Sequence, residues 1–531
     1  MRPLLWVFAF QGLFAQEANF EDYLRFYNEL VSEQRAVGCE VYPCTTSSSS
    51  TVPPGNYLPI VVQNNSQVSD PIYLTVIGTN NDTKNQVYLT FGASLISGSQ
   101  VGGFIDVQAV PDGTEIPSYQ INSSDGSSTF YLPPVSGGRL YFSRGSPLTL
   151  KTLGGGIVTP SVTNPSLPEY NIMFDVVEIA YIEGAGDTSV NPNATAVAFF
   201  SMPLETNLST PAPGTSATTG LSTAGGGKRS DILAHASTLF NMIPASTVPA
   251  DKDNIKLNWT NLFSPSHTPS SSLRILSPAT AMTLSDVSVP WMLKYAFDPN
   301  YLDNETDYGY SFLKNVWYGT APASYYRTNS TDLYIQSPHT MTSYNGTILG
   351  TMQSDSAVCF VPCPQAGPTV CSGTGCEVYD APSNMGPGGA PYKTTSWKIF
   401  GAENLGTYPT ADGEDNQVSK LFEEAVIAGL IPYMYPMGSP LSETRFVTFG
   451  TSQYYDQTGI QAGTLPNNTN MTAPWYDLYS RALHTVSGSV TGVSGQVYTY
   501  GFDEPLWPDV KSNGPFISGS TKVTITIGNL N

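Results

Sequence analysis

The predicted fold depends on residues 173–203, MFDVVEIAYIEGAGDTSVNPNATAVAFFSMP, which contain two β-rich runs joined by a polar loop. Successive side chains of a strand point to opposite faces, so residues 173–182 present two different surfaces. One face carries Phe174, Val176, Glu178, Ala180 and Ile182, and the other carries Asp175, Val177, Ile179, Tyr181 and Glu183. The stretch predicts a strand pair in which Glu178 lies among apolar neighbours.

A carboxyl group among apolar side chains loses hydration, which favours its protonated form. A protonated carboxyl group can donate a proton to a leaving oxygen, so Glu178 is a candidate general acid. The alternative interpretation is a structural one, in which Glu178 lies on an edge strand between half-exposed neighbours.

Short β-rich runs extend outward from this stretch over residues 57–205, separated by Asn-Asn, Gly and Pro. Their spacing is typical of an all-β sandwich or barrel. The end of the chain returns to β-rich runs, QVYTYGFDEPLW and STKVTITIGNLN. We therefore expect one β-sandwich/barrel domain made of residues 57–208 and 490–531.

A Ser/Thr/Pro/Gly-rich stretch, residues 209–229, predicts a linker to a mixed α/β domain over residues 230–489. Helical spacing of apolar residues indicates helices in this second domain. The candidate helices are residues 230–243, 304–319, 415–432 and 473–487. The expected fold class is a β-rich α+β protein, with the β domain packed against the α/β domain.

The N-terminal residues MRPLLWVFAFQGLFAQ combine one basic residue with a short apolar run, which predicts a signal peptide over residues 1–15. Residues 16–56 are expected to hold a helix, a Cys loop and a Ser/Pro linker. Later segments lack an apolar run of the length that spans a bilayer. The expected location is secreted or extracellular, and no membrane span is expected.

An even number of cysteines in a secreted chain favours disulfides. They are Cys39, Cys44, Cys359, Cys363, Cys371 and Cys376. Cys39 and Cys44 form the obvious local pair, and the Cys-rich loop 359–376 leaves three connectivities open. A metal knuckle is the competing interpretation of that loop, but it contains no histidine and its spacings are not of the paired CxxC kind. Neither a metal nor a cofactor is expected.

Eleven N-x-S/T sequons suggest a glycosylated secreted protein. They begin at Asn64, Asn81, Asn122, Asn193, Asn207, Asn258, Asn304, Asn329, Asn345, Asn467 and Asn470.

The net charge of −20 argues against a nucleic-acid partner, because an acidic surface repels phosphate groups. Only 12% of the residues are charged, and the chain has 31 Tyr. This composition fits a neutral polysaccharide, since sugar rings stack on aromatic faces, although tyrosines also occur widely in β-sheets.

Several segments, in the same order, resemble the β-1,3-glucanases of glycoside hydrolase family 64. They are LPIVVQNNSQVSDPIYLTVIGTN, GRLYFSRGSPL, IVTPSVTNPSLPEYNIMFDVVEIAY, AVAFFSMPLE, SLRILSPATA, WYDLYSRALHTVS and VYTYGFDE, within residues 57–510. The resemblance implies a thaumatin-like β domain, a groove between it and the α/β domain, and an inverting mechanism. It places Glu178 at the position of the general acid.

The chain departs from the family pattern at the general base, because Ala198 occupies the position of the expected Asp. Ala180 and Ile182 also stand where the family usually has polar residues. A methyl group cannot deprotonate water, and loss of a general base costs about 10²–10⁴ in rate. Glu183 or Asp187 in the lengthened loop are the candidate substitute bases, and Asp503 and Glu504 are a second possible source of the carboxylate. Tyr181, Asp503 and Glu504 are also predicted to contact the substrate.

Three functions follow from these patterns. The first is a catalytically impaired secreted protein, a pseudoenzyme, that binds β-1,3-glucan or a related wall or matrix polysaccharide. The second is an active inverting endo-β-1,3-glucanase with a relocated carboxylate base. The third is a structural subunit of an extracellular assembly that self-associates through the N-terminal helix.

Overall fold

The computed structural model describes residues 57–210, 217–241, 259–281, 477–500 and 521–531, apart from residues 93, 98, 124 and 185–186. It also describes the short strands 332–336, 347–354, 357–363, 392–393 and 512–514. The signal peptide, the N-terminal helix and the candidate helices 304–319 and 415–432 lie outside the described residues. Cys39, Cys44, Cys371 and Cys376 also lie outside them, and Cys359 and Cys363 lie in a strand of which only the backbone is described.

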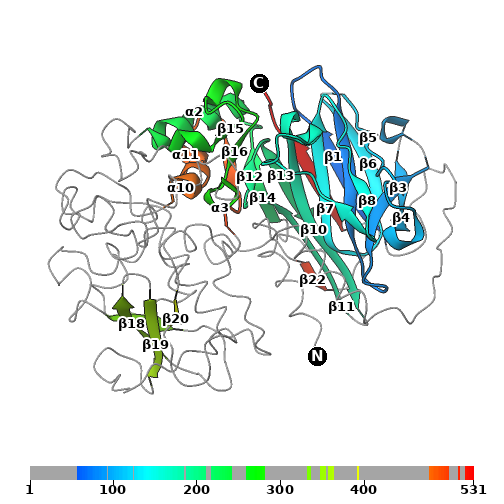
Figure 1. The fold of residues 1–531 in the computed structure, drawn as a ribbon. Helices are drawn as coiled ribbons and strands as arrows, with labels where there is room; N and C mark the ends of the chain where they lie inside the picture. The colour runs from blue at the N-terminus through cyan, green and yellow to red at the C-terminus, as the bar shows by residue number, and fades with distance from the viewer. Residues whose placement is uncertain are drawn as a thin grey trace.

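One large β-sheet dominates the described part of the chain (Figure 1). Its strand order is β21-β14-β13-β23-β1-β6-β4-β3-β2-β7-β10-β11-β22, and β5 pairs with β2. The bounds are β1 Leu58–Asn64, β2 Ile72–Asn80, β3 Gln86–Phe91, β4 Gln100–Asp106, β5 Tyr119–Gln120, β6 Gly126–Leu132, β7 Val135–Arg144, β10 Phe174–Gly184, β11 Asp187–Ala194, β13 Leu204–Ser209, β14 Ala217–Ser222, β21 Ser494–Gln496, β22 Ser512–Gly514 and β23 Lys522–Ile527.

Three smaller sheets accompany it, in the orders β8-β9, β12-β16-β15 and β17-β18-β19-β20. Their bounds are β8 Lys151–Leu153, β9 Gly156–Val158, β12 Phe199–Phe200, β15 Phe263–Ser264, β16 Arg274–Leu276, β17 Asp332–Gln336, β18 Thr347–Ser354, β19 Ala357–Cys363 and β20 Tyr392–Lys393. The α-helices are α2 Arg229–Phe240, α3 Pro278–Ala281, α10 Leu478–His484 and α11 Val486–Ser489. Single 3₁₀ turns cover Leu95–Ser97, Val107–Ala109, Pro168–Asn171, Trp259–Leu262 and Pro269–Ser271.

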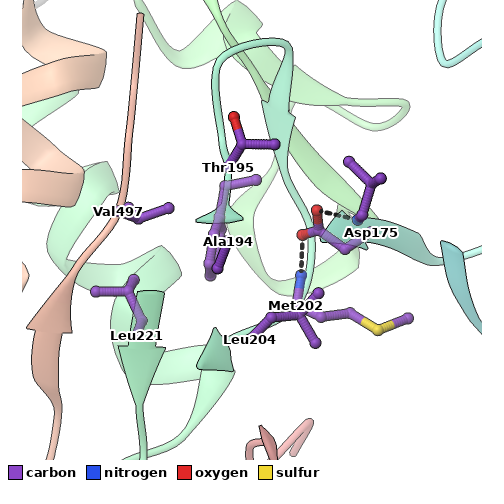
Figure 2. A pocket seen from close by; sticks show the side chains of 9 residues that line it. Asp175, Ala194, Thr195, Met202, Leu204, Leu221 and Val497 are labelled. Carbon is purple, nitrogen blue, oxygen red and sulfur yellow. Dashed lines mark hydrogen bonds between the residues drawn. The ribbon is translucent and has the colours of Figure 1, made fainter. Parts of the chain in front are cut away.

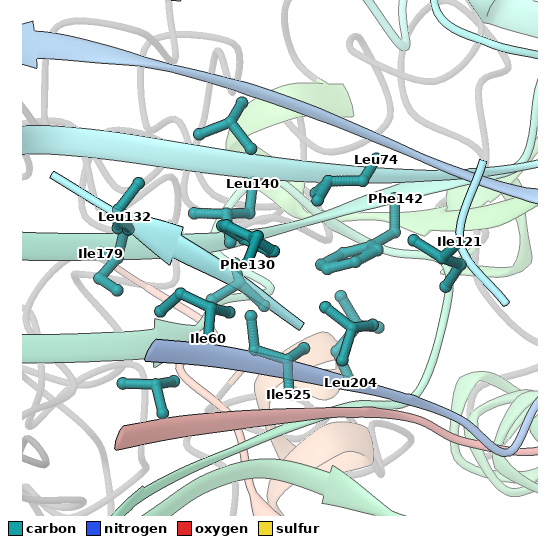
Figure 3. Close-up of a cluster of buried hydrophobic side chains, with 14 of the residues drawn as sticks. Ile60, Leu74, Ile121, Phe130, Leu132, Leu140, Phe142, Ile179, Leu204 and Ile525 are labelled. Carbon is teal, nitrogen blue, oxygen red and sulfur yellow. The ribbon is translucent and has the colours of Figure 1, made fainter. Parts of the chain in front are cut away.

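The large sheet curls around a hydrophobic core (Figure 3). Strands far apart in the sequence supply this core, for example Ile60 of β1, Phe130 of β6, Ile179 of β10 and Ile525 of β23. Strand β23 lies between β1, which runs parallel to it, and β13, which runs antiparallel. The predicted β-rich α+β class is confirmed by this strand-rich architecture with few helices.

Helices α2 and α10 lie together beside the β14 end of the sheet (Figure 1). His235 Nε2 of α2 and Thr485 Oγ1, which follows α10, are 3.0 Å apart. The prediction of a helix over residues 230–243 is confirmed, with α2 ending at Phe240. The helix predicted over residues 473–487 begins later, at Leu478, because the carboxylate of Asp477 accepts the N–H of Tyr479 and caps α10.

The predicted linker 209–229 differs from the structure, because residues 217–222 form strand β14. β14 pairs with β13 and β21, and Thr219 is buried, so the Ser/Thr/Gly-rich composition belongs partly to the sheet. Threonine is β-branched and favours strands, but a Thr-rich composition alone does not distinguish a strand from a linker.

None of the helices in the described residues is long and apolar enough to cross a membrane.

The position of β23 predicts a large cost for truncation of its inward side chains. Ile525→Ala removes a fully buried side chain from the core and should lower the free energy of unfolding by about 2–5 kcal/mol. Thr524→Ala, at a half-buried position on the opposite face of the same strand, should cost much less. Urea unfolding of both variants measures the difference, and equal costs would contradict the placement of β23 in the core.

Candidate functional site

Glu178 lies in the interior of the large sheet, on β10 between β7 and β11. Its neighbours across the two strand pairs are Arg139 of β7 and Asn193 of β11. Arg139 Nη2 lies 3.4 Å from Glu178 Oε1, and each of the two side chains is 24% exposed. The apolar surroundings expected from the sequence are therefore interrupted by an ion pair, and Glu178 does not lie on an edge strand.

Arg139 also interacts with the side chain of Tyr141, two residues further along β7. Burial opposes the charge of the guanidinium, but Tyr141 and Glu178 outweigh burial and raise the pKa of Arg139. Burial raises the pKa of Tyr141, although Arg139 acts against this rise, so the phenol stays neutral. The centre of the site consists of one cation, one carboxylate and one neutral phenol.

The alternation predicted for β10 agrees with its burial. Val177, Ile179 and Tyr181 are buried in the core, whereas Glu178, Ala180 and Ile182 are half-buried on the other face. Tyr181 was predicted to contact a substrate, but its side chain is fully buried on the face opposite Glu178. Its ring is therefore part of the core and is not at the surface that Glu178 reaches.

Ala198 is exposed in the segment between β11 and β12, and three residues far from it in the sequence bond to this segment. The N–H of Ala196 donates to the carbonyl of Tyr498 at 2.7 Å, and the hydroxyl of Tyr479 donates to the carbonyl of Ala196. The N–H of Ser277 donates to the carbonyl of Ala198 at 3.0 Å. The backbone at position 198 is firmly held, and its side chain is a methyl group in contact with solvent.

Asp175 connects the strand of Glu178 to the segment that follows Ala198 (Figure 2). Its buried carboxylate accepts the N–H groups of Ser201 at 2.7 Å and Met202 at 2.8 Å, and that of Val176 at 2.8 Å. Burial raises the pKa of Asp175 to about 7, against the opposite effect of these N–H groups and of Arg229. The adjoining cavity is only about 10 Å³, room for about one water and too small for a sugar.

Residues 56–299 match the family model of the Glyco_hydro_64 β-1,3-glucanases. The resemblance to glycoside hydrolase family 64 is confirmed. None of the curated proteins searched matches this chain.

Two solved family 64 structures share the fold. A laminaripentaose-producing β-1,3-glucanase in complex with laminaritetraose is 17% identical, covers 90% of this chain and 99% of its own, and has a TM-score of 0.55. A β-1,3-glucanase domain (GH64) from Clostridium beijerinckii is 18% identical, covers 90% of this chain and 100% of its own, and has a TM-score of 0.51. At these identities the likeness extends to the fold alone.

The substitute bases predicted on the family 64 scaffold lie far along the hairpin from Glu178. Glu183 is five residues further along β10 and on the opposite face, a separation of roughly 16 Å at about 3.3 Å per residue. Asp187 pairs with Gly184, beyond Glu183. Inverting carboxyl pairs lie about 6.5–9.5 Å apart. Asp503 and Glu504 lie outside the described residues.

Within the described part of the chain, no group of three or more His, Cys, Asp or Glu side chains is arranged to hold a metal ion. The residues that sequence reasoning missed are Arg139, Tyr141 and Asp175, which the strand pairing and the bonds to residues 201 and 202 bring to the site. A signal for Arg139 was present in the sequence, since an arginine in the strand-like segment GRLYFS needs a partner when half-buried.

The described sequons differ in how accessible their amides are. Asn64 is buried, its Nδ2 donates to the carbonyl of Asn122 at 2.8 Å, and its Oδ1 accepts the N–H of Ser66. An amide held in this way is not accessible for glycosylation in the folded protein. Asn193, Asn81, Asn122 and Asn207 are half-buried. The sequons at Asn258, Asn304, Asn329, Asn345, Asn467 and Asn470 lie outside the described residues.

The raised pKa of Asp175, about 7 against an ordinary 3.8, predicts a pH-dependent stability. The folded state binds this proton more tightly than the unfolded state, so the free energy of unfolding should fall as pH rises from about 4 to about 7. Asp477, whose pKa burial also raises to about 7, contributes in the same direction.

Asp175→Asn should remove part of this dependence, by an amount on the order of 2–4 kcal/mol. Urea unfolding at pH 5 and pH 8 measures the change, with Asp70→Asn at the exposed Arg144 ion pair as the control. A pH dependence that is identical in the wild type and in Asp175→Asn would contradict the prediction.

Proposed function

We propose that this chain is a secreted β-1,3-glucan-binding protein built on the family 64 scaffold, and that it has lost hydrolysis. The observation that carries the proposal is Ala198, an exposed methyl group on a firmly held backbone, where the family resemblance expects the general base. Support for the glucan comes from the family match over residues 56–299 and from the fold. The solved relative with the higher TM-score was crystallised with laminaritetraose.

Inverting hydrolysis needs a carboxylate that activates water on the face of the sugar opposite the acid. A methyl group at position 198 cannot accept that proton. The backbone spacing of β10 places Glu183 outside the range of an inverting pair, and Asp187 is further still. These points argue against an active enzyme that uses the lengthened loop as its base.

Glu178 is paired with Arg139, whose Nη2 lies 3.4 Å from Glu178 Oε1. The same pair is well suited to binding, because it presents hydrogen-bonding groups that are partly exposed. The methyl group at position 198 and the partly exposed Arg139–Glu178 pair favour a binding function over a catalytic one.

Restoring the base tests the proposal. The wild type should bind laminarin and release no oligosaccharides from it, measured by calorimetry and a reducing-sugar assay. Ala198→Asp should raise laminarin hydrolysis above the wild-type background by about 10²-fold or more, because a general base contributes about 10²–10⁴ in rate.

The matched control is Ala198→Asp combined with Glu178→Gln, which keeps the new base and removes the acid, and should return hydrolysis to background. Efficient hydrolysis by the wild type that Glu178→Gln abolishes would overturn the loss of catalysis. An absence of laminarin binding by the wild type would overturn the proposed ligand.

A further inference from the structure

We infer that Arg139 and Glu178 together form a sugar-hydroxyl site that accepts an uncharged glycan and disfavours an anionic one. The inference rests on the proposed function, because it names residues and a ligand charge class for the same surface. It adds a binding residue, Arg139, from a strand that precedes β10 in the chain by a long connection.

The two side chains present complementary groups at one point of the surface. Arg139 offers only donors, and the carboxyl oxygens of Glu178 accept hydrogen bonds. A sugar hydroxyl both donates and accepts, so one hydroxyl or two adjacent ones can bond to both side chains at once. Bonds to charged groups of this kind are about twice as strong as those between neutral groups.

The pair is partly accessible to solvent, since each of the two side chains is 24% exposed. Directly opposed residues of neighbouring strands share a face, which places Asn193 of β11 next to Glu178 and Asn191 next to Ala180. Half-buried Ala180 and Ile182 extend the same face with apolar groups that suit the C–H surfaces of a sugar ring.

The charge of the site is balanced. On β7, the positive charge of Arg139 faces the carboxylate of Glu178 on β10, and the buried Tyr141 beside it remains a neutral phenol. The residues of β11 that share this face, Asn191 and Asn193, carry no charge. The chain as a whole has a net charge of −20, which repels a polyanion. An anionic glycan would also have to compete with Glu178 for the guanidinium.

A binding comparison tests this inference with two polymers, laminarin and carboxymethylated β-1,3-glucan, measured by calorimetry at low ionic strength. The wild type should bind laminarin at least 10-fold more tightly than the carboxymethylated polymer. Arg139→Met should weaken laminarin binding by 10-fold or more, and Arg139→Lys should recover only part of it, because lysine lacks the planar fork of donors.

The matched control is Arg144→Met. Arg144 is on the same strand, its side chain is 28% exposed, and it is paired with Asp70 at 2.7 Å. Removal of this arginine changes the net charge equally but should alter laminarin binding by less than twofold. Thermal unfolding of both variants shows whether either has lost its fold.

Glu178→Gln gives the sharpest outcome, because it leaves Arg139 without its carboxylate. This variant should bind laminarin less tightly and the carboxymethylated polymer at least fivefold more tightly than the wild type. Laminarin binding by the wild type that is unaffected by Arg139→Met, or no gain for the anionic polymer in Glu178→Gln, would overturn the inference alone. Failure of the wild type to bind laminarin would overturn both the inference and the proposed function.

Discussion

The carboxylate of Asp175 is the interaction on which the geometry of the site depends. It joins β10, the strand of Glu178, to the backbone N–H groups of Ser201 and Met202, which follow the segment of Ala198. A buried carboxylate without such donors would be costly, and buried N–H groups without an acceptor would be equally so. The carboxylate and the two N–H groups therefore each need the other, and this buried contact joins the strand of Glu178 to the segment of Ala198.

Two buried arginines extend this constraint into the helical part of the molecule. Arg229 at the start of α2 donates to the carbonyls of Ser201, Ser272 and Leu273. Arg274 of β16 donates to the carbonyls of Tyr170 and Ile172, and lies over the ring of Phe174. Burial lowers the pKa of each arginine to about 10, which leaves both charged at neutral pH. Their charges offset that of Asp175, and their donors bind carbonyls in the segments before β10, after β12 and before β16.

Local patterns predicted the parts of this structure that depend on neighbours in the sequence. The alternation of β10 gave the correct faces for Glu178 and Tyr181, and helical spacing identified α2. The partner of Glu178 was beyond reach, because Arg139 precedes it by a long connection and meets it only through the register of β7 and β10. Alternation within one strand shows which face a residue lies on, but it does not show which strands pair on either side. The same limit explains why β14 was predicted as a linker and Asn64 as an accessible sequon.

A change of side chain at position 198 should cost the fold little stability. The contacts that hold position 198 are made by backbone groups, since the carbonyl of Ala198 accepts from Ser277 and the neighbouring Ala196 is bonded through its own N–H and carbonyl. None of these bonds depends on the identity of the side chain at position 198, which is exposed. Exposed substitutions away from special contacts usually change stability by less than about 0.5 kcal/mol, whereas removal of a general base costs about 10²–10⁴ in rate. The side chain at position 198 can therefore vary without loss of the fold, and the surface around Arg139 and Glu178 keeps its shape when it does.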